Sequence, residues 1–188
     1  ELLRSVNLDP EIVGNRKPTE FSGGQCQRVS IARALSLEPK LLVCDEPVSS
    51  LDVSIQSQIL NIIQNMKKRY GLSLLFISHD LSVVRAISDR VIVMYLGKIC
   101  EVSTPQKSVS SPAHHYTRAL VASVPVPDPK IGRRPAVIEG EPPSPANPPS
   151  GCRFRTRCAA ATALCAEQEP QLREVSLGQF VACHHPIV

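Results

Sequence analysis

Residues Leu41-Leu42-Val43-Cys44-Asp45-Glu46-Pro47 form a short apolar run that ends in two carboxylates and a proline. A continuous apolar run of this length is typical of a strand covered on both faces, as in a parallel sheet. Open α/β sheets bind their ligands at the carboxyl ends of the strands, where Asp45 and Glu46 lie. Because neighbouring side chains on a strand diverge, we expect one acid to hold a cation and the other to face a reactant. The alternative interpretation of an isolated Asp-Glu pair is a solvated acidic turn.

The same arrangement recurs downstream, where a second apolar run leads directly into Ser78-His79-Asp80. Parallel neighbours end at one edge of a sheet, so His79 is expected close to Asp45 and Glu46. A lone histidine is more often structural than chemical, but two strands that deliver reactive side chains to one edge favour a site. The alternation of elements predicts an α/β fold with parallel strands. The predicted elements are a helix over 26–35, a strand over 41–44, a helix over 53–69, a strand over 72–77, a helix over 81–87 and a strand over 91–95. This last strand turns at Gly97 into residues 98–102.

Upstream, Phe21-Ser22-Gly23-Gly24-Gln25 opens the first predicted helix. A hydroxyl, two glycines and an amide at a helix start can cradle an anion, because free N–H groups and the positive end of the helix dipole point the same way. The same residues also fit a capping box, in which Ser22 and Gln25 close the helix end without a ligand. Taken alone, the stretch leaves both interpretations open.

Composition limits the class of protein. The chain has 188 residues, 43% of them hydrophobic, which is enough for one packed domain with an appendage. A formal charge of +4 and 4% aromatic residues give no basis for nucleic-acid binding. No apolar run is long enough to span a bilayer, and the sequence from Glu1 does not resemble a signal peptide.

The end of the chain differs in composition from the rest. Residues 125–149 hold nine of the seventeen prolines, which predicts a linker. Four of the seven cysteines then crowd residues 150–188, at Cys152, Cys158, Cys165 and Cys183. An odd total and the absence of a signal-like start favour metal ligation over disulfides for these four. Their spacing suits either zinc or an iron–sulfur cluster. The expected organisation is a domain over 1–124, a linker over 125–149 and a small Cys-rich module over 150–188.

In order and spacing, these motifs resemble the ATP-binding subunits of ABC transporters. Residues 21–25 resemble the ABC signature loop, 41–46 the Walker B strand, 50–52 the D-loop, and His79 the switch histidine. Residues 21–28, 44–49 and 51–56, together with the tail over 148–158, are similar to the oligopeptide and dipeptide importer ATPases, particularly their F-type subunit.

This resemblance implies a role for each motif. Ser22, Gly23, Gly24 and Gln25 would contact ATP bound by a second ATPase subunit. Asp45 would hold Mg²⁺ through water, Glu46 would act as the catalytic base, and His79 would contact the γ-phosphate. Asp52 would couple the two sites. The four tail cysteines would bind a four-iron, four-sulfur cluster.

The resemblance also implies partners and a location. The subunit would work with a second ATP-binding subunit, two membrane-spanning permease subunits and, indirectly, a peptide-binding protein. It would lie peripherally on the cytoplasmic face of the bacterial inner membrane, where it couples ATP hydrolysis to peptide import.

One motif of the family is absent from these residues. A P-loop needs Gly-x-x-x-x-Gly-Lys-Ser/Thr, but the single Gly-Lys pair, Gly97-Lys98, has Ile92 and Ile99 at the other motif positions. The chain is therefore expected to be the C-terminal part of an ATPase subunit that is inactive by itself. The alternative is a non-catalytic remnant that can only complete a partner's ATP site.

Overall fold

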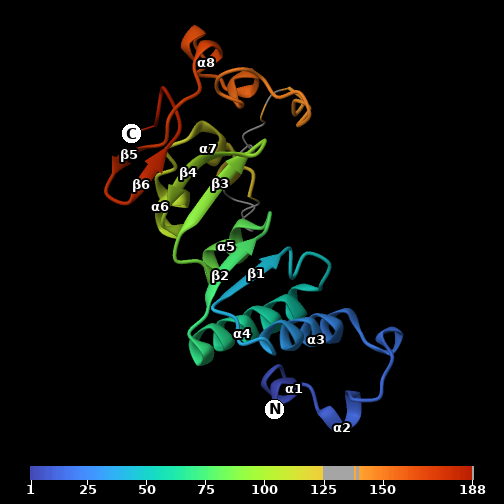
Figure 1. Cartoon of the computed structure of the whole chain (residues 1–188). Helices are drawn as coiled ribbons and strands as arrows, with labels where there is room; N and C mark the ends of the chain where they lie inside the picture. The colour runs from blue at the N-terminus through green and yellow to red at the C-terminus, as the bar shows by residue number, and fades with distance from the viewer. Residues whose placement is uncertain (125–137, 139, 188) are drawn as a thin grey trace, which may run out of the picture. The chain divides into compact units, whose positions relative to one another are not determined.

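The computed structural model describes residues 1–124, 138 and 140–187. The chain divides into two compact units, Glu1–Ile87 and Ser88–Val188, and each is described by itself (Figure 1). The elements of the first unit are α1 (Leu2–Ser5), α2 (Pro10–Val13), the 3-10 helix η1 (Pro18–Glu20), α3 (Gly23–Leu35), β1 (Leu41–Asp45), α4 (Val53–Tyr70), β2 (Ser73–Ile77) and α5 (Leu81–Ile87). The predicted helices and strands of this unit all occur, within a few residues of their expected ends.

Strands β1 and β2 form a parallel pair in which Asp45 is opposite Ile77. Figure 1 shows α3 and α4 side by side along one face of these strands. The core between helices and strands contains Ile59 and Ile63 of α4, which are fully buried, and Leu42 and Cys44 of β1. Apolar residues at helical spacing on α4 thus bury one helix face, as the sequence pattern predicted.

The expectation that β1 is covered on both faces is wrong for this unit. Leu42 and Cys44 are buried, but Leu41 and Val43 are 54% and 55% exposed. On β2, Leu75 and Ile77 are also nearly half exposed. Helices α3 and α4 cover a single face, so the side chains that alternate to the other face stay about half exposed.

The second unit is built on an antiparallel sheet of order β3-β4-β6-β5. The third predicted strand therefore does not join the parallel pair: β3 turns at Gly97 into β4, which pairs in turn with β6 from the tail. The tail is consequently part of one unit with residues 88–124. The elements are β3 (Val91–Tyr95), β4 (Lys98–Ser103), α6 (Pro105–Ser110), α7 (His115–Ala122), the 3-10 helix η2 (Arg155–Arg157), α8 (Ala163–Glu167), β5 (Arg173–Ser176) and β6 (Gln179–Val181).

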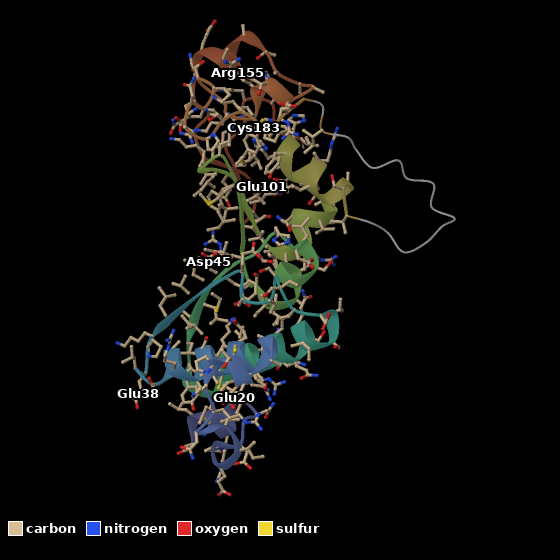
Figure 2. The ribbon with its side chains drawn as sticks, turned by 90° about the vertical axis from the view of Figure 1, so that its right-hand side faces the viewer. Glu20, Glu38, Asp45, Glu101, Arg155 and Cys183 are labelled. Carbon is tan, nitrogen blue, oxygen red and sulfur yellow. The ribbon has the colours of Figure 1, made fainter. Side chains whose placement is uncertain are left out.

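Glu101 of β4 holds this unit together (Figure 2). Its side chain is fully buried, and its carboxylate accepts hydrogen bonds from the backbone N–H groups of Ala113 (3.1 Å) and His114 (2.8 Å). Nε2 of Gln179 donates a further bond of 2.8 Å from β6. One carboxylate thereby joins β4, the start of α7 and the tail strand.

Most of the predicted linker falls outside the described residues. Residues 140–149 are described and contain neither helix nor strand. The division into compact units falls between Ile87 and Ser88. The domain and linker boundaries expected after residues 124 and 149 stay predictions. Among the described residues, no helix combines the length and apolar character needed to cross a membrane.

Candidate functional site

The carboxyl edge of the parallel strands brings together the residues predicted there. Asp45 ends β1 and is exposed (Figure 2). Glu46 follows it, and its N–H donates to the carbonyl of Ile77 at the end of β2 (3.0 Å). Nδ1 of His79 lies 2.9 Å from Oε1 of Glu46. The two strand ends are thus linked both through the backbone and through the side chains.

The charge of Glu46 changes the acid–base behaviour of His79. The hydrogen bond from the ring to Glu46 raises the pKa of His79, and the negative charges of Glu46 and Asp80 add to this effect. The second carboxylate oxygen of Glu46, Oε2, is buried without a hydrogen-bond partner among the described residues. Glu46 therefore has one oxygen engaged by the histidine and a second that the protein encloses without a hydrogen-bond donor, which is an unfavourable state for a carboxylate oxygen.

Asp80 has a structural role next to this site. Its Oδ1 accepts from the N–H groups of Ser82 (2.8 Å) and Val83 (3.3 Å) and so caps the start of α5. This cap fixes the chain directly after His79. The Ser-His-Asp order thus combines a reactive side chain with the start signal of the next helix.

Glu46 also has an unusual backbone conformation. Its φ angle is +46°, in the left-handed region that residues with a Cβ seldom adopt. Both the N–H (3.4 Å) and the hydroxyl (3.1 Å) of Ser49 donate to its carbonyl oxygen. Sequence reasoning missed this role of Ser49, although a serine in the turn that follows a strand is a common turn signal.

The signature stretch forms the capping box that the sequence allowed. The Ser22 hydroxyl accepts from the N–H of Gln25 (3.3 Å), and Oε1 of Gln25 accepts from the N–H of Ser22 (3.0 Å). Both side chains are thus occupied with the helix end, and a phosphate would have to compete with these bonds or use the remaining N–H groups of the first turn.

Packing accounts for one of the two glycines of the stretch, Gly24, whereas Gly23 has room for a Cβ in ordinary contact. A Cβ on Gly24 would lie 2.7 Å from Cγ2 of Ile55, and one on Gly23 would lie 3.4 Å from a methyl group of Leu51. The start of α3 therefore approaches the segment that contains Asp52. Asp52 itself is the N-cap residue of α4, but its side chain is exposed and makes no capping bond.

The four tail cysteines lie in one unit, and the charges of three of them act on the pKa of the fourth, Cys183. The N–H of Cys152 donates to the carbonyl of Cys165 (2.8 Å), and this contact requires Gly151, whose Cβ would lie 2.4 Å from the same carbonyl. Burial raises the pKa of Cys183 to about 11, and the charges of Cys152, Cys158 and Cys165 add to the effect. Within the described ranges, no three or more His, Cys, Asp or Glu side chains form a group that could hold a metal ion. The geometry thus gives no support to the predicted cluster.

Known proteins are similar to nearly the whole of this chain. Residues 1–49 match the family described as "ABC transporter", and residues 100–165 match "Oligopeptide/dipeptide transporter, C-terminal region". The chain is 53% identical to the oligopeptide transport ATP-binding protein OppF of Haemophilus influenzae, with 97% of this chain and 55% of that protein aligned. It is 55% identical to OppF of Salmonella typhimurium, over 97% of this chain and 54% of that protein.

A solved structure shows the same fold over part of the chain. The ADP conformation of MJ1267, an ATP-binding cassette of an ABC transporter, superposes with a TM-score of 0.53 and 31% identity, over 59% of this chain and 44% of that chain. The chain spans about half the length of the curated relatives that it matches. With both family descriptions and these relatives in agreement, the chain belongs to the ATP-binding proteins of ABC transporters, in the oligopeptide and dipeptide branch.

Proposed function

We propose that this chain is part of an ATPase subunit that powers peptide import, and that it supplies the residues that hydrolyse ATP. The hydrogen bond between Glu46 and His79 at the ends of two parallel strands is the observation that carries this proposal. A carboxylate at this position can accept a proton from the attacking water, and the histidine beside it can donate to the γ-phosphate. The printed names of the relatives, oligopeptide transport ATP-binding proteins, support the same role.

Asp45 is the residue that would hold Mg²⁺. Its carboxylate is exposed at the strand end, and oxygen donors of this kind suit Mg²⁺, which usually takes one or two carboxylates together with substrate phosphates and water. The ion would neutralise charge on the phosphates of ATP. Glu46, whose side chain is partly exposed at the same strand edge, would then act on the water itself.

The signature stretch and Asp52 would act across a subunit interface. In our proposal Ser22, Gly23, Gly24 and Gln25 face ATP that is held by a second ATPase subunit. Gly24 lies so close to Ile55 of α4 that a Cβ would not fit between them, and this contact supports a link between the signature stretch and the segment of Asp52. Two permease subunits and a peptide-binding protein complete the proposed importer, at the cytoplasmic face of the inner membrane.

A comparison of the chain with a longer subunit tests this function. The 188-residue chain should show no ATP hydrolysis above background, because no P-loop motif occurs in it. A chimera, in which this chain replaces the matching segment of the Haemophilus OppF protein, should hydrolyse ATP within the transporter, with unmodified OppF as control. Turnover by the chain alone, or a folded but inert chimera, would contradict the proposal. The inert chimera would favour the second candidate, a non-catalytic remnant.

We also propose a metal centre at Cys152, Cys158, Cys165 and Cys183. Four thiols in one unit form a donor set that suits a four-iron, four-sulfur cluster or zinc. Anaerobic purification followed by analysis of iron, sulfide and zinc tests the centre. Replacing Cys158 by serine should remove the metal, and replacing Cys26, an exposed thiol in the first unit, should not. A chain without bound metal would refute this part of the proposal.

A further inference from the structure

The backbone of Glu46 is held from both sides. Its N–H is bound by the carbonyl of Ile77 at 3.0 Å, and its own carbonyl is bound by Ser49. Between these two anchors lies the left-handed φ angle of +46°. Since a residue with a Cβ adopts this conformation at a cost, the surrounding hydrogen bonds must maintain it.

Ser49 contributes more than an ordinary turn bond. Its N–H lies 3.4 Å from the Glu46 carbonyl oxygen, beyond the usual range for N–H donors, whereas its hydroxyl lies 3.1 Å away, just beyond the usual range for O–H donors. The side chain is exposed, so packing does not account for its position. The hydrogen bond to Glu46 is therefore the main structural contribution of this hydroxyl.

The turn that carries Ser49 is itself fixed to α4. The carbonyl of Val48 accepts from the N–H of Leu51 (3.2 Å) and from Nε2 of Gln56 on α4 (3.0 Å). Val48 is buried in the core of the first unit. Ser49 therefore lies in a turn that is held by hydrogen bonds and by the core. Its hydroxyl in turn holds the backbone of Glu46, the residue that contacts His79.

We propose that Ser49 is a positioning residue whose hydroxyl holds the left-handed backbone of Glu46 and so aims the Glu46 carboxylate at His79. The effect on catalysis rests on the proposed function, because it requires Glu46 to be the base. The aiming of the carboxylate at His79 is a property of this chain alone. The two consequences can therefore be measured separately.

The first measurement uses the 188-residue chain and the ring ¹⁵N and ¹³C chemical shifts of His79 at a fixed pH. Ser49→Ala should move these shifts towards those of Glu46→Gln, because the carboxylate loses its direction. Ser49→Thr keeps a hydroxyl and should preserve the wild-type shifts. Ser57→Ala is the matched control, since its hydroxyl also donates to a backbone carbonyl at 3.1 Å, that of Val53 within α4.

The second measurement uses the chimeric subunit in the transporter. Ser49→Ala should lower kcat for ATP by about tenfold to a hundredfold with little change in KM, the size expected when a reacting group is misplaced by about an ångström. If Ser49→Ala does not fold, Ser49→Thr is compared with Ser49→Val instead, because valine has the shape of threonine but no hydroxyl.

The outcomes separate the two claims. Unchanged His79 shifts in Ser49→Ala, or in Ser49→Val, overturn the positioning role whatever happens to kcat. Altered shifts with unchanged kcat support the positioning role and count instead against Glu46 as the base of the proposed ATPase. Altered shifts together with a lower kcat, both restored by threonine, support the whole proposal.

Discussion

Nδ1 of His79 and Oε1 of Glu46 are 2.9 Å apart, and this contact joins the ends of the two parallel strands. Both side chains remain in contact with solvent, with 77% and 37% of their surfaces exposed. Water therefore weakens the attraction between them, and we expect the contact to direct the side chains more than to stabilise the fold.

The first prediction concerns the titration of His79. Because Glu46 favours the charged ring, the pKa of His79 should lie above its usual value of 6.5. Its contribution to stability should be present at low pH and be lost as pH rises through the raised pKa. Titration by NMR should show the raised value, and Glu46→Gln should lower it. Ring signals of His114, in the other unit, should be unaffected; an unchanged His79 pKa in Glu46→Gln would argue against the contact.

The second prediction concerns the contact between Gly24 and Ile55. Alanine in a helix is favoured over glycine by up to about 1 kcal/mol, whereas forcing a methyl group into a packed contact costs about 1–3 kcal/mol. Gly24→Ala should therefore destabilise the chain, because its Cβ would lie 2.7 Å from a methyl group of a stiff, β-branched side chain.

The control for this prediction is the Ile55→Ala background. There the obstructing methyl group is gone, and Gly24→Ala should become neutral or stabilising in thermal unfolding. The same destabilisation in both backgrounds would mean that Gly24 is required for another reason.

The third prediction concerns the buried carboxylate of Glu101. Glu101→Gln replaces one acceptor oxygen by a donor that faces the N–H groups of Ala113 and His114 and the amide of Gln179. The loss in unfolding free energy should be about 1–3 kcal/mol. Glu167→Gln, at an exposed position of α8, should change it by no more than about 0.5 kcal/mol. Equal stability of the two variants would show that the Glu101 network is dispensable.

The fourth prediction concerns His114, which caps α7 by accepting the N–H of Tyr116 (3.0 Å). Burial, and to a lesser extent the neighbouring His115, lowers the pKa of His114 to about 4 from 6.5. The unfolded chain then binds more protons below pH 6.5, so stability should be full above that pH and fall towards pH 4. The loss should approach ~3 kcal/mol.

Replacement of His114 by asparagine, which also caps helices, isolates this contribution. Denaturant unfolding between pH 7 and pH 4 should show a shallower loss of stability in His114→Asn than in the wild type. Parallel curves for the two proteins would assign the pH dependence to other groups.

Local sequence patterns predicted the elements of the first unit well. The apolar run of β1, the Ser-x-x-Gln start of α3 and the strand ends at Glu46 and His79 are all signals within a few residues. Each depends on a short-range rule of hydrogen bonding or side-chain alternation, which is why it could be recognised without the structure.

Long-range pairings were not predictable in this way. Strand β3 looks like a third parallel strand, but its sheet is completed by β6 from a tail about 80 residues further along. Glu101 resembles an ordinary strand acid until its partners, from α7 and β6, are known. The left-handed φ angle of Glu46 could not be predicted either, because glutamate rarely adopts this conformation.

Glu46 is the residue on which the proposed ATPase depends most, and its replacement by glutamine in the chimeric subunit is the most direct test. The measurement is the rate of ATP hydrolysis by the assembled transporter at saturating ATP, with ATP binding measured in parallel. Glu46→Gln should bind ATP as the parent does and lose hydrolysis by a factor on the order of 10² to 10⁴, whereas Glu38→Gln, on an exposed loop, should hydrolyse normally. Near-normal turnover in Glu46→Gln would contradict the role of Glu46 as the catalytic base.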